Sequence, residues 1–315
     1  MKRRVIVVGG GPAGMMSAIT AAKEGVEVTI LEHNDRIGKK ILSTGNGRCN
    51  FTNEYQSPSE YRSDEQSFPW KVVSQFPYEE TLRFFEELGI MGKKKNGGLY
   101  PFSEQASAVL DVLRMEVERR RITVYTGVNV LEIKAVRNGF RVIAASKEQG
   151  RETFCGDALI LATGSKAASK LGSDGSGYSL AKSMGHSMIP VVPALVQLEC
   201  CENFYKALAG VRVYGKVMLL IDGKEAATDT GEIQLTDYGI SGIPVFQVSR
   251  FAARGLYEKR RVKAVMDFMP DFSEKAFADY IGKRIAEKPD KKMELFLVGV
   301  FHKKPSFDIK LYLSA

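Results

Sequence analysis

The strongest constraint on the fold is a glycine-rich turn close to the N-terminus. The run Arg4 to Val8 is short, apolar and rich in β-branched residues, which is typical of a buried parallel strand. The chain turns through Gly9 to Gly14, and the next residues predict a helix from Met15 to Glu24. A second strand is predicted from Val26 to Leu31. A strand, a helix and a parallel strand in this order predict the α/β fold class.

The glycine spacing predicts a dinucleotide site. Gly9, Gly11 and Gly14 satisfy G-x-G-x-x-G, in which the glycines allow a tight turn, close approach of the backbone to a pyrophosphate, and helix–strand packing. The pyrophosphate would lie on the helix N-terminus. Glu32 follows at about the 20-residue spacing expected for a carboxylate that accepts the ribose hydroxyls. The predicted contacts are Gly9, Gly11, Pro12, Ala13, Gly14 and Glu32. A carboxylate repels a 2′-phosphate, which leaves FAD and NAD.

A hairpin further along the chain distinguishes these two cofactors. Alternating segments at 130–135 and 140–145 flank Arg137-Asn138-Gly139, a strong hairpin signal. The run 157–164 then predicts a buried strand that ends in Ala162, Thr163 and Gly164. This order resembles the flavin domain of the glutathione-reductase superfamily, so FAD is the predicted cofactor. The run 172–177 has the wrong spacing for a second dinucleotide motif and is interpreted as a surface turn. NAD(P)H is therefore expected to bind only transiently, as a reductant.

The charge and hydropathy of the sequence bear on whether the protein binds nucleic acid or a membrane. The net charge of +8 admits nucleic acid, but the cations are scattered and lack the interleaved aromatics of a nucleic-acid groove. Solvated faces are therefore the favoured interpretation. The uncharged stretch 5–22 is interrupted by glycines and Pro12, so it predicts neither a membrane span nor a signal peptide.

The cysteines indicate a reducing compartment. Cys49, Cys155, Cys200 and Cys201 show no CxxC spacing and no histidine at zinc-ligand distance. No metal site and no disulfide framework are predicted, and the adjacent Cys200 and Cys201 are interpreted as packing thiols. We expect a cytoplasmic protein.

The length of 315 residues predicts roughly two domains. A helix is expected from Ser103, as its N-cap, to Arg121. After Pro193 the chain changes to short strand-like runs that predict a small all-β unit, and from Ser273 it predicts helices. The expected domains are an FAD-binding Rossmann-like domain at 1–192, an inserted β-rich substrate domain at 193–268 and a helical cap at 269–315.

Three longer motifs carry a more specific resemblance. Residues 36–53 read RIGKKILSTGNGRCNFTN, residues 99–103 read LYPFS, and residues 235–242 read LTDYGISG. Together they resemble a family of conserved NAD(P)/FAD-dependent flavoproteins that includes aminoacetone oxidase-like and bile-acid dehydroxylation-pathway reductase-like enzymes. The resemblance covers residues 4 to about 304. It implies a β-barrel-like unit and a helical cap inserted between two halves of the FAD domain.

The resemblance also implies cofactor contacts. It places the loop Gly45 to Asn50 against FAD, and its glycines, amides and Arg48 suit a phosphate or carboxylate. It matches Val128 to a position whose backbone meets the adenine. For Lys40, phosphate contact and solvation are both open. The implied contacts are Lys40, Gly45, Gly47, Arg48, Cys49, Asn50, Val128, Ala162, Thr163 and Gly164.

No catalytic residue is assigned. Cys49 and Tyr238 are candidates for a redox thiol and a proton donor, although a structural role is favoured for both. Asp237 stands where the family often carries histidine, so no histidine acid is expected there. The histidines are interpreted as surface residues: His33, His186 and His302.

The predicted function is an FAD-dependent oxidoreductase that transfers hydride at flavin N5 to or from a small organic substrate. Reduction of an enone-type C=C bond and oxidation of an amine are both open. The alternatives are a tRNA-modifying or other nucleic-acid-acting flavoprotein and an inactive truncated flavoprotein. The last rests on the tail, because nothing after Val300 resembles the family's C-terminal return segment and Pro305 to Ala315 breaks the preceding pattern. We therefore expect a truncated chain that binds FAD weakly. Its substrate, redox partner and oligomeric state stay open.

Overall fold

The computed structural model describes residues 2–65, 67–146 and 150–301, and the chain divides between Ile189 and Pro190 into two compact units. The first unit contains β1 (Arg4–Val8), α1 (Pro12–Lys23), β2 (Glu27–Leu31), η1 (Lys39–Gly47), β3 (Thr52–Asn53), η2 (Pro58–Glu60), α2 (Ser67–Val73), α3 (Tyr78–Glu87), β4 (Gly92–Lys95), β5 (Gly98–Pro101), α4 (Ala106–Arg119), β6 (Thr123–Tyr125), β7 (Val128–Val136), β8 (Gly139–Ser146), β9 (Gly150–Gly156), β10 (Ala158–Leu161), η3 (Ser169–Leu171) and α5 (Ser176–Ser183). The second unit contains β11 (Leu198–Glu199), α6 (Tyr205–Leu208), β12 (Arg212–Ile221), β13 (Lys224–Leu235), β14 (Gly239–Ser241), α7 (Ile243–Tyr257), β15 (Val262–Asp267), α8 (Glu274–Glu287) and α9 (Met293–Phe296).

A four-stranded parallel sheet forms the centre of the first unit, in the order β10-β1-β2-β6. Val5 of β1 lies opposite Val28 on one side and Ala158 on the other. The predicted β-α-β unit is confirmed, and α1 begins at Pro12 rather than Met15, because proline suits the first turn of a helix, where its missing N–H costs nothing. The predicted Rossmann-like fold class is therefore confirmed.

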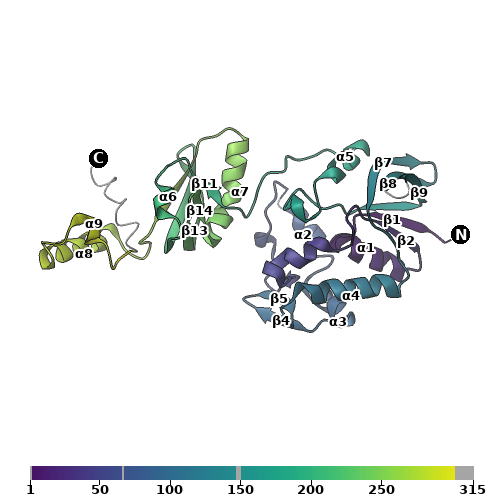
Figure 1. Cartoon of the computed structure of the whole chain (residues 1–315), viewed down its shortest axis with the longest axis horizontal. Helices are drawn as coiled ribbons and strands as arrows, with labels where there is room; N and C mark the ends of the chain where they lie inside the picture. The colour runs from purple at the N-terminus through teal and green to yellow at the C-terminus, as the bar shows by residue number, and fades with distance from the viewer. Residues whose placement is uncertain (1, 66, 147–149, 302–315) are drawn as a thin grey trace. The chain divides into compact units, whose positions relative to one another are not determined.

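Different elements cover the two faces of this sheet. Figure 1 shows α1 beside β1 and β2, and α1 also contacts α4. Fully buried Val7, Met15 and Ile19 belong to the core on this side. The antiparallel meander β7-β8-β9 contacts the sheet from the other face, where Ile6 and Val142 are buried together. The sheet is thus enclosed by helices and a meander, as the sequence predicts.

The second unit differs from its prediction. Its antiparallel sheet has the order β11-β14-β13-β12-β15, and the long helix α7 packs on β12 and β13. The expectation of an all-β unit was therefore wrong. Val245, Val248 and Ala252 recur at helical spacing on one face of α7 and are buried in the core of this unit. That helical period was present in the sequence.

Two serines near helix starts show when a sequence pattern predicts an N-cap correctly and when it does not. Ser273 caps α8, because its Oγ accepts the N–H of Ala276 at 3.2 Å. Ser103 does not cap α4, so that prediction was wrong. The helix begins at Ala106 after Gln105, whose N–H donates to Ser103 Oγ at 3.4 Å across a turn.

The described residues do not test the expectations about the C-terminal tail and the domain boundaries. Residues 302–315, which include His302 and the change of pattern at Pro305, lie outside the described residues. The predicted domain boundaries at 192 and 268 stay predictions. No helix in the described part of the chain is long and apolar enough to cross a membrane.

Candidate functional site

A cavity of about 530 Å³ opens where the parallel strands end. Val8, Leu31 and Leu161, the last residues of β1, β2 and β10, all line it. Ligands bind α/β sheets at this carboxyl edge, since the turns that leave the strands converge there. The wall also includes Gly9, Gly11, Pro12, Ala13, Glu32, His33, Asn34, Lys40, Val128, Ala162, Thr163, Gly164 and Ser173.

The three motif glycines serve different purposes in this wall. A Cβ on Gly9 would lie 2.5 Å from the carbonyl oxygen of Ala162, and a Cβ on Gly14 would lie 1.8 Å from the carbonyl oxygen of Gly9. Protein packing therefore requires these two glycines. A Cβ on Gly11 would meet nothing within 4 Å, although Gly11 lines the cavity at the start of α1. The space beside Gly11 suits a pyrophosphate held at a helix N-terminus.

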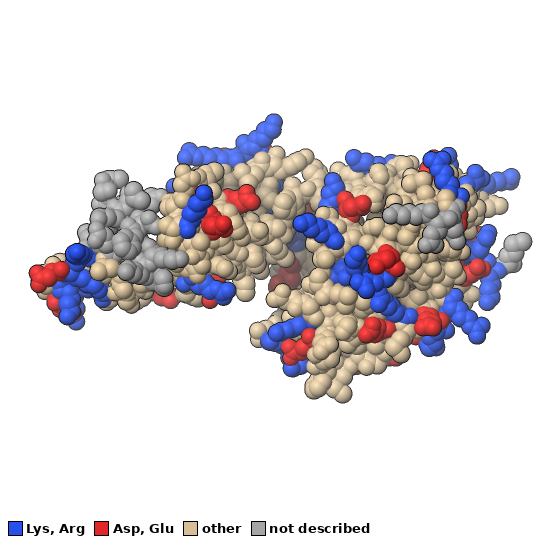
Figure 2. Space-filling view, in the orientation of Figure 1, with Lys and Arg blue, Asp and Glu red and all other residues tan. Residues whose placement is uncertain are grey.

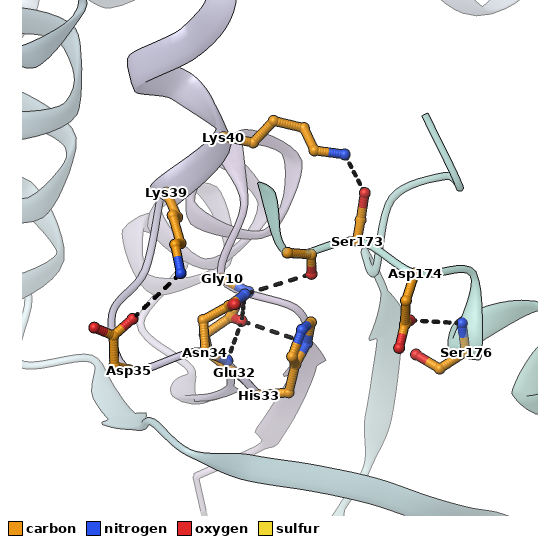
Figure 3. A network of polar contacts seen from close by, with 11 residues as sticks. Gly10, Glu32, His33, Asn34, Asp35, Lys39, Lys40, Ser173, Asp174 and Ser176 are labelled. Carbon is orange, nitrogen blue, oxygen red and sulfur yellow. Dashed lines mark hydrogen bonds and ion pairs between the residues drawn. The ribbon is translucent and has the colours of Figure 1, made fainter. Parts of the chain in front are cut away.

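Glu32 is held rigidly at the floor of the cavity (Figure 3). Its side chain is buried, and Oε2 accepts the N–H of Gly10 at 2.7 Å. Oε1 accepts the backbone N–H of Asn34 at 2.7 Å and its Nδ2 at 2.6 Å. Each carboxylate oxygen can accept further hydrogen bonds, so Glu32 can also take ribose hydroxyls.

His33 is part of this network. Its Nδ1 lies 3.6 Å from Glu32 Oε1, and it lines the cavity. His33 is exposed, so its interpretation as a surface residue is confirmed, and this exposed side chain also borders the cavity at the strand ends.

The loop after β10 forms another part of the wall of the cavity at the strand ends. Lys40 Nζ donates to the carbonyl of Ala167 at 2.7 Å and also to Ser173 Oγ, as Figure 3 shows for the serine. Ser173 Oγ in turn donates to the carbonyl of Ser165 at 2.5 Å. Lys40 is therefore held by protein contacts in the wall, and its contact with phosphate stays a prediction.

Residues 172–175 form a turn before a helix with Asp174 exposed, as predicted, but part of this turn also lines the cavity. Ser173 is buried in the cavity wall, and α5 begins at Ser176. Beside it, a hydrogen bond from the Ser176 backbone holds the pKa of the Asp174 carboxyl below its ordinary value. Ser173 and Ser176 line the cavity, whereas Asp174 does not.

Val128 also lies where the sequence places it. It begins β7, is buried and lines the cavity. Its N–H donates to the carbonyl of Glu32 at 2.9 Å. A contact with adenine would therefore use the remaining groups of Val128, and it stays a prediction.

The loop Gly45 to Asn50 does not line this cavity in the described chain. Gly45, Arg48 and Asn50 instead line a separate hollow of about 370 Å³, and Gly47 lines neither space. The complete lining of this hollow, called here the hairpin hollow, is Gly45, Asn46, Arg48, Asn50, Asn53, Lys95, Asn96, Gly98 and Tyr100. The predicted FAD contacts of this loop stay predictions.

The two catalytic candidates have different surroundings. Cys49 is 7% exposed and belongs to the core, and burial raises the pKa of its thiol despite a hydrogen bond with Thr44 that lowers it. A thiol with a raised pKa is a poor nucleophile at neutral pH. Tyr238 lies between β13 and β14 of the second unit and is 40% exposed. Its proton-donor role stays a prediction.

Sequence reasoning missed Asn34 and Ser173. Asn34 follows a strand that ends at a ligand site, and this place in the chain was a usable signal. Ser173 contacts the distant Lys40 in the cavity wall, and no local sequence pattern reveals that contact. Among the described residues, no group of three His, Cys, Asp or Glu side chains is placed to hold a metal ion.

The sequence is similar to two curated enzymes, and the fold is similar to that of a solved dehydrogenase. The chain is 46% identical over 303 residues to the 3-dehydro-bile acid delta(4,6)-reductase of Clostridium scindens, an alignment that covers 96% of this chain and 73% of the relative. It is 29% identical over 248 residues to the ribosomal RNA dihydrouridine synthase of Haemophilus influenzae, covering 78% of this chain and 61% of that protein. Among solved structures, a 3-ketosteroid-delta4-(5alpha)-dehydrogenase from Rhodococcus jostii RHA1 has a TM-score of 0.47 at 13% identity, over 67% of this chain and 59% of that one.

A match to a family model assigns the chain to a protein family. The model of the HI0933-like protein Rossmann domain matches residues 3–281, which is most of the chain. The cavity at the strand ends supplies what a flavin dinucleotide requires, namely a helix N-terminus beside an open glycine and a fixed carboxylate. The chain therefore belongs to the HI0933-like Rossmann-domain family of flavin-dependent oxidoreductases.

Proposed function

We propose that this chain binds FAD in the cavity at the strand ends and reduces a conjugated C=C bond in a steroid-like carbonyl compound. Gly11 and the first turn of α1 would hold the pyrophosphate, and Glu32 would hold the adenosine ribose. When bound, the flavin supplies two-electron chemistry at its N5 position. The observation that supports cofactor binding is the open space beside Gly11 in an otherwise close-packed turn.

The proposed substrate class rests on the Clostridium scindens relative. Its name describes reduction of a delta(4,6) 3-dehydro-bile acid, and the alignment covers nearly all of this chain. The chain spans 73% of that relative's length, so its activity and substrates are proposals here. NAD(P)H is proposed as the transient reductant, since neither unit carries a second G-x-G-x-x-G after a strand.

A spectroscopic experiment tests this function. The purified chain should show flavin absorbance, be bleached anaerobically by NADH or NADPH, and regain colour when a 4,6-dien-3-one bile acid is added. Glu32→Ala should lower the ratio of flavin to protein absorbance, whereas substitution of the exposed carboxylate at the start of β2, Glu27→Ala, should not. Absence of flavin, or a bleached flavin that the dienone leaves reduced, contradicts the proposal. Bleaching by aminoacetone would indicate amine oxidation instead.

The dihydrouridine synthase relatives favour a second candidate, action on RNA. Figure 2 shows Lys and Arg interspersed with Asp and Glu over the visible face, which is a weak footprint for a polyanion. Filter binding of ribosomal RNA across a salt titration separates the two functions. Tight binding that falls steeply with salt would favour RNA, and weak binding would favour the small substrate.

A further inference from the structure

The hairpin hollow has a construction of its own. It lies between the loop after η1 and the β4–β5 hairpin, and it shares no lining residue with the cavity at the strand ends. Asn96 and Gly97 connect the two strands with positive φ angles of 50° and 78°, the conformation of a tight two-residue hairpin turn. The hollow therefore has a fixed wall made by the backbone.

Glycines keep this space open. A Cβ on Gly98 would lie 2.8 Å from Asn50 Nδ2, and a Cβ on Gly45 would lie 2.7 Å from the backbone nitrogen of Asn50. Side chains at either position would collide with Asn50 and distort the wall. Two glycines from distant parts of the chain thus converge on one asparagine.

The charges around the hollow are one-sided. Arg48 and Lys95 line it, and no carboxylate does. The neighbouring lysines are already paired, because Lys94 Nζ lies 2.8 Å from Glu54 Oε2 and Lys93 contacts Glu104. Lys95 makes no ion pair within the described chain, although the Glu104 carboxylate interacts with its charge at longer range.

Arg48 is only loosely neutralised. Its NH1 lies 3.6 Å from Glu104 Oε2, and Glu104 also binds Lys93. A depression lined by cations alone concentrates anions. The hollow therefore has an electrostatic preference for a negative group.

Uncharged donors complete the lining. Asn53 Oδ1 accepts the N–H of Tyr55 at 2.8 Å, so its remaining hydrogen-bonding group is the NH₂ donor. Asn46 and Asn96 are exposed in left-handed turns and carry further amide donors. A guanidinium, an ammonium and several amides form a donor set that suits a carboxylate.

We propose that the hairpin hollow is a subsite for the carboxylate end of an organic substrate, with Arg48 and Lys95 as its charged contacts. This inference rests on the proposed function, because it concerns the same substrate class. The proposal reassigns Gly45, Arg48 and Asn50, which line the hollow, from the predicted flavin contact to the substrate, and it leaves Gly47 and Cys49 to the flavin. Lys95 would act as a specificity residue that selects acids over their uncharged esters.

The run of three lysines supplies a matched control. Neighbouring residues of a strand point to opposite faces, and Lys94 contacts Glu54 and the ring of Tyr78 outside the hollow. Calorimetric titration of the full chain with cholate and with methyl cholate should be performed on wild type, Lys95→Gln, Lys95→Arg and Lys94→Gln. Lys95→Gln should weaken cholate binding about tenfold, the loss of one charge-assisted hydrogen bond. Lys95→Arg and Lys94→Gln should bind as wild type, and methyl cholate should not distinguish the variants.

The outcomes separate this inference from the proposed function. Equal cholate affinity in Lys95→Gln and wild type overturns the subsite, whatever the flavin spectrum shows. Loss of flavin absorbance in Lys95→Gln also overturns it, because the hollow would then serve the cofactor. If cholate binding depends on Lys95 in a chain that the dienone cannot reoxidise, the subsite stands and the proposed reaction fails.

Discussion

At the scale of single residues, the three glycines of one motif are required for different reasons. Gly9 and Gly14 are required by neighbouring backbone atoms, whereas Gly11 borders open space. A motif match alone treats the three positions as equal. Substitution can separate the role in folding from the role in cofactor binding.

Gly14→Ala should destabilise the fold by about 3 kcal/mol, because its Cβ would overlap the Gly9 carbonyl oxygen. Gly11→Val should cost about 1 kcal/mol of folding free energy, because Gly11 is the N-cap of α1, and should abolish flavin retention. Thermal unfolding and the visible spectrum, measured on the same samples, check both statements. A flavin-replete Gly11→Val protein would show that the pyrophosphate lies elsewhere.

At the scale of elements, most local units were predictable and long-range contacts were not. The β1-α1-β2 unit and the β7–β8 hairpin follow from spacing and turn residues within short windows. The long helix α7 was missed although its buried residues recur at helical spacing, a local signal that the prediction did not use. Ser173 contacts Lys40, far away in the sequence, so no window contains both.

The helix α4 ends in a charged cluster with a defined pH response. Glu116 is buried, and Arg119 binds it through two hydrogen bonds of 2.7 and 2.8 Å, with Arg120 Nε at 2.6 Å from Oε1. Hydrogen bonding from Arg119, with a further contribution from Arg120, lowers the pKa of the Glu116 carboxyl from 4.5 to about 2. The ionised form is therefore favoured in the folded state.

Because the folded pKa is depressed, this stabilisation is complete above pH 4.5 and is lost as pH falls toward 2. Glu116→Gln should cost at most about 3 kcal/mol at neutral pH, a difference that shrinks over that acid range. Urea unfolding at a series of pH values measures it. Glu118→Gln, at an exposed position of the same helix, is the control and should show no such dependence. A pH-independent cost for Glu116→Gln would contradict the ion-pair argument.

At the scale of the whole molecule, each unit has its own buried core. One core includes Val7 and Met15, and the other includes Val217 and Val245. The connection at 187–195 has no regular structure and exposes Ile189 and Leu195. We predict that each of these two cores opens as its own cooperative unit.

Hydrogen exchange should show this arrangement directly. Amides at 187–195 should exchange fastest within the described chain, whereas those of β1 and β12 should be protected until their own unit opens. Mass spectrometry of peptic fragments after timed labelling provides the measurement. Strong protection across 187–195 would show that the connection is packed.

The Asn96–Gly97 turn at the hairpin hollow is also a site at which asparagine can deamidate slowly. Asn96 is exposed and Gly97 is buried. In an Asn-Gly pair the glycine nitrogen can attack the asparagine side-chain carbonyl, which releases ammonia and forms a cyclic imide that hydrolyses to aspartate or isoaspartate. Each event would place a new negative charge beside Arg48 and Lys95. Deamidated protein would then bind organic acids more weakly than freshly prepared protein. The measured affinity for an acid would therefore fall as the protein sample ages.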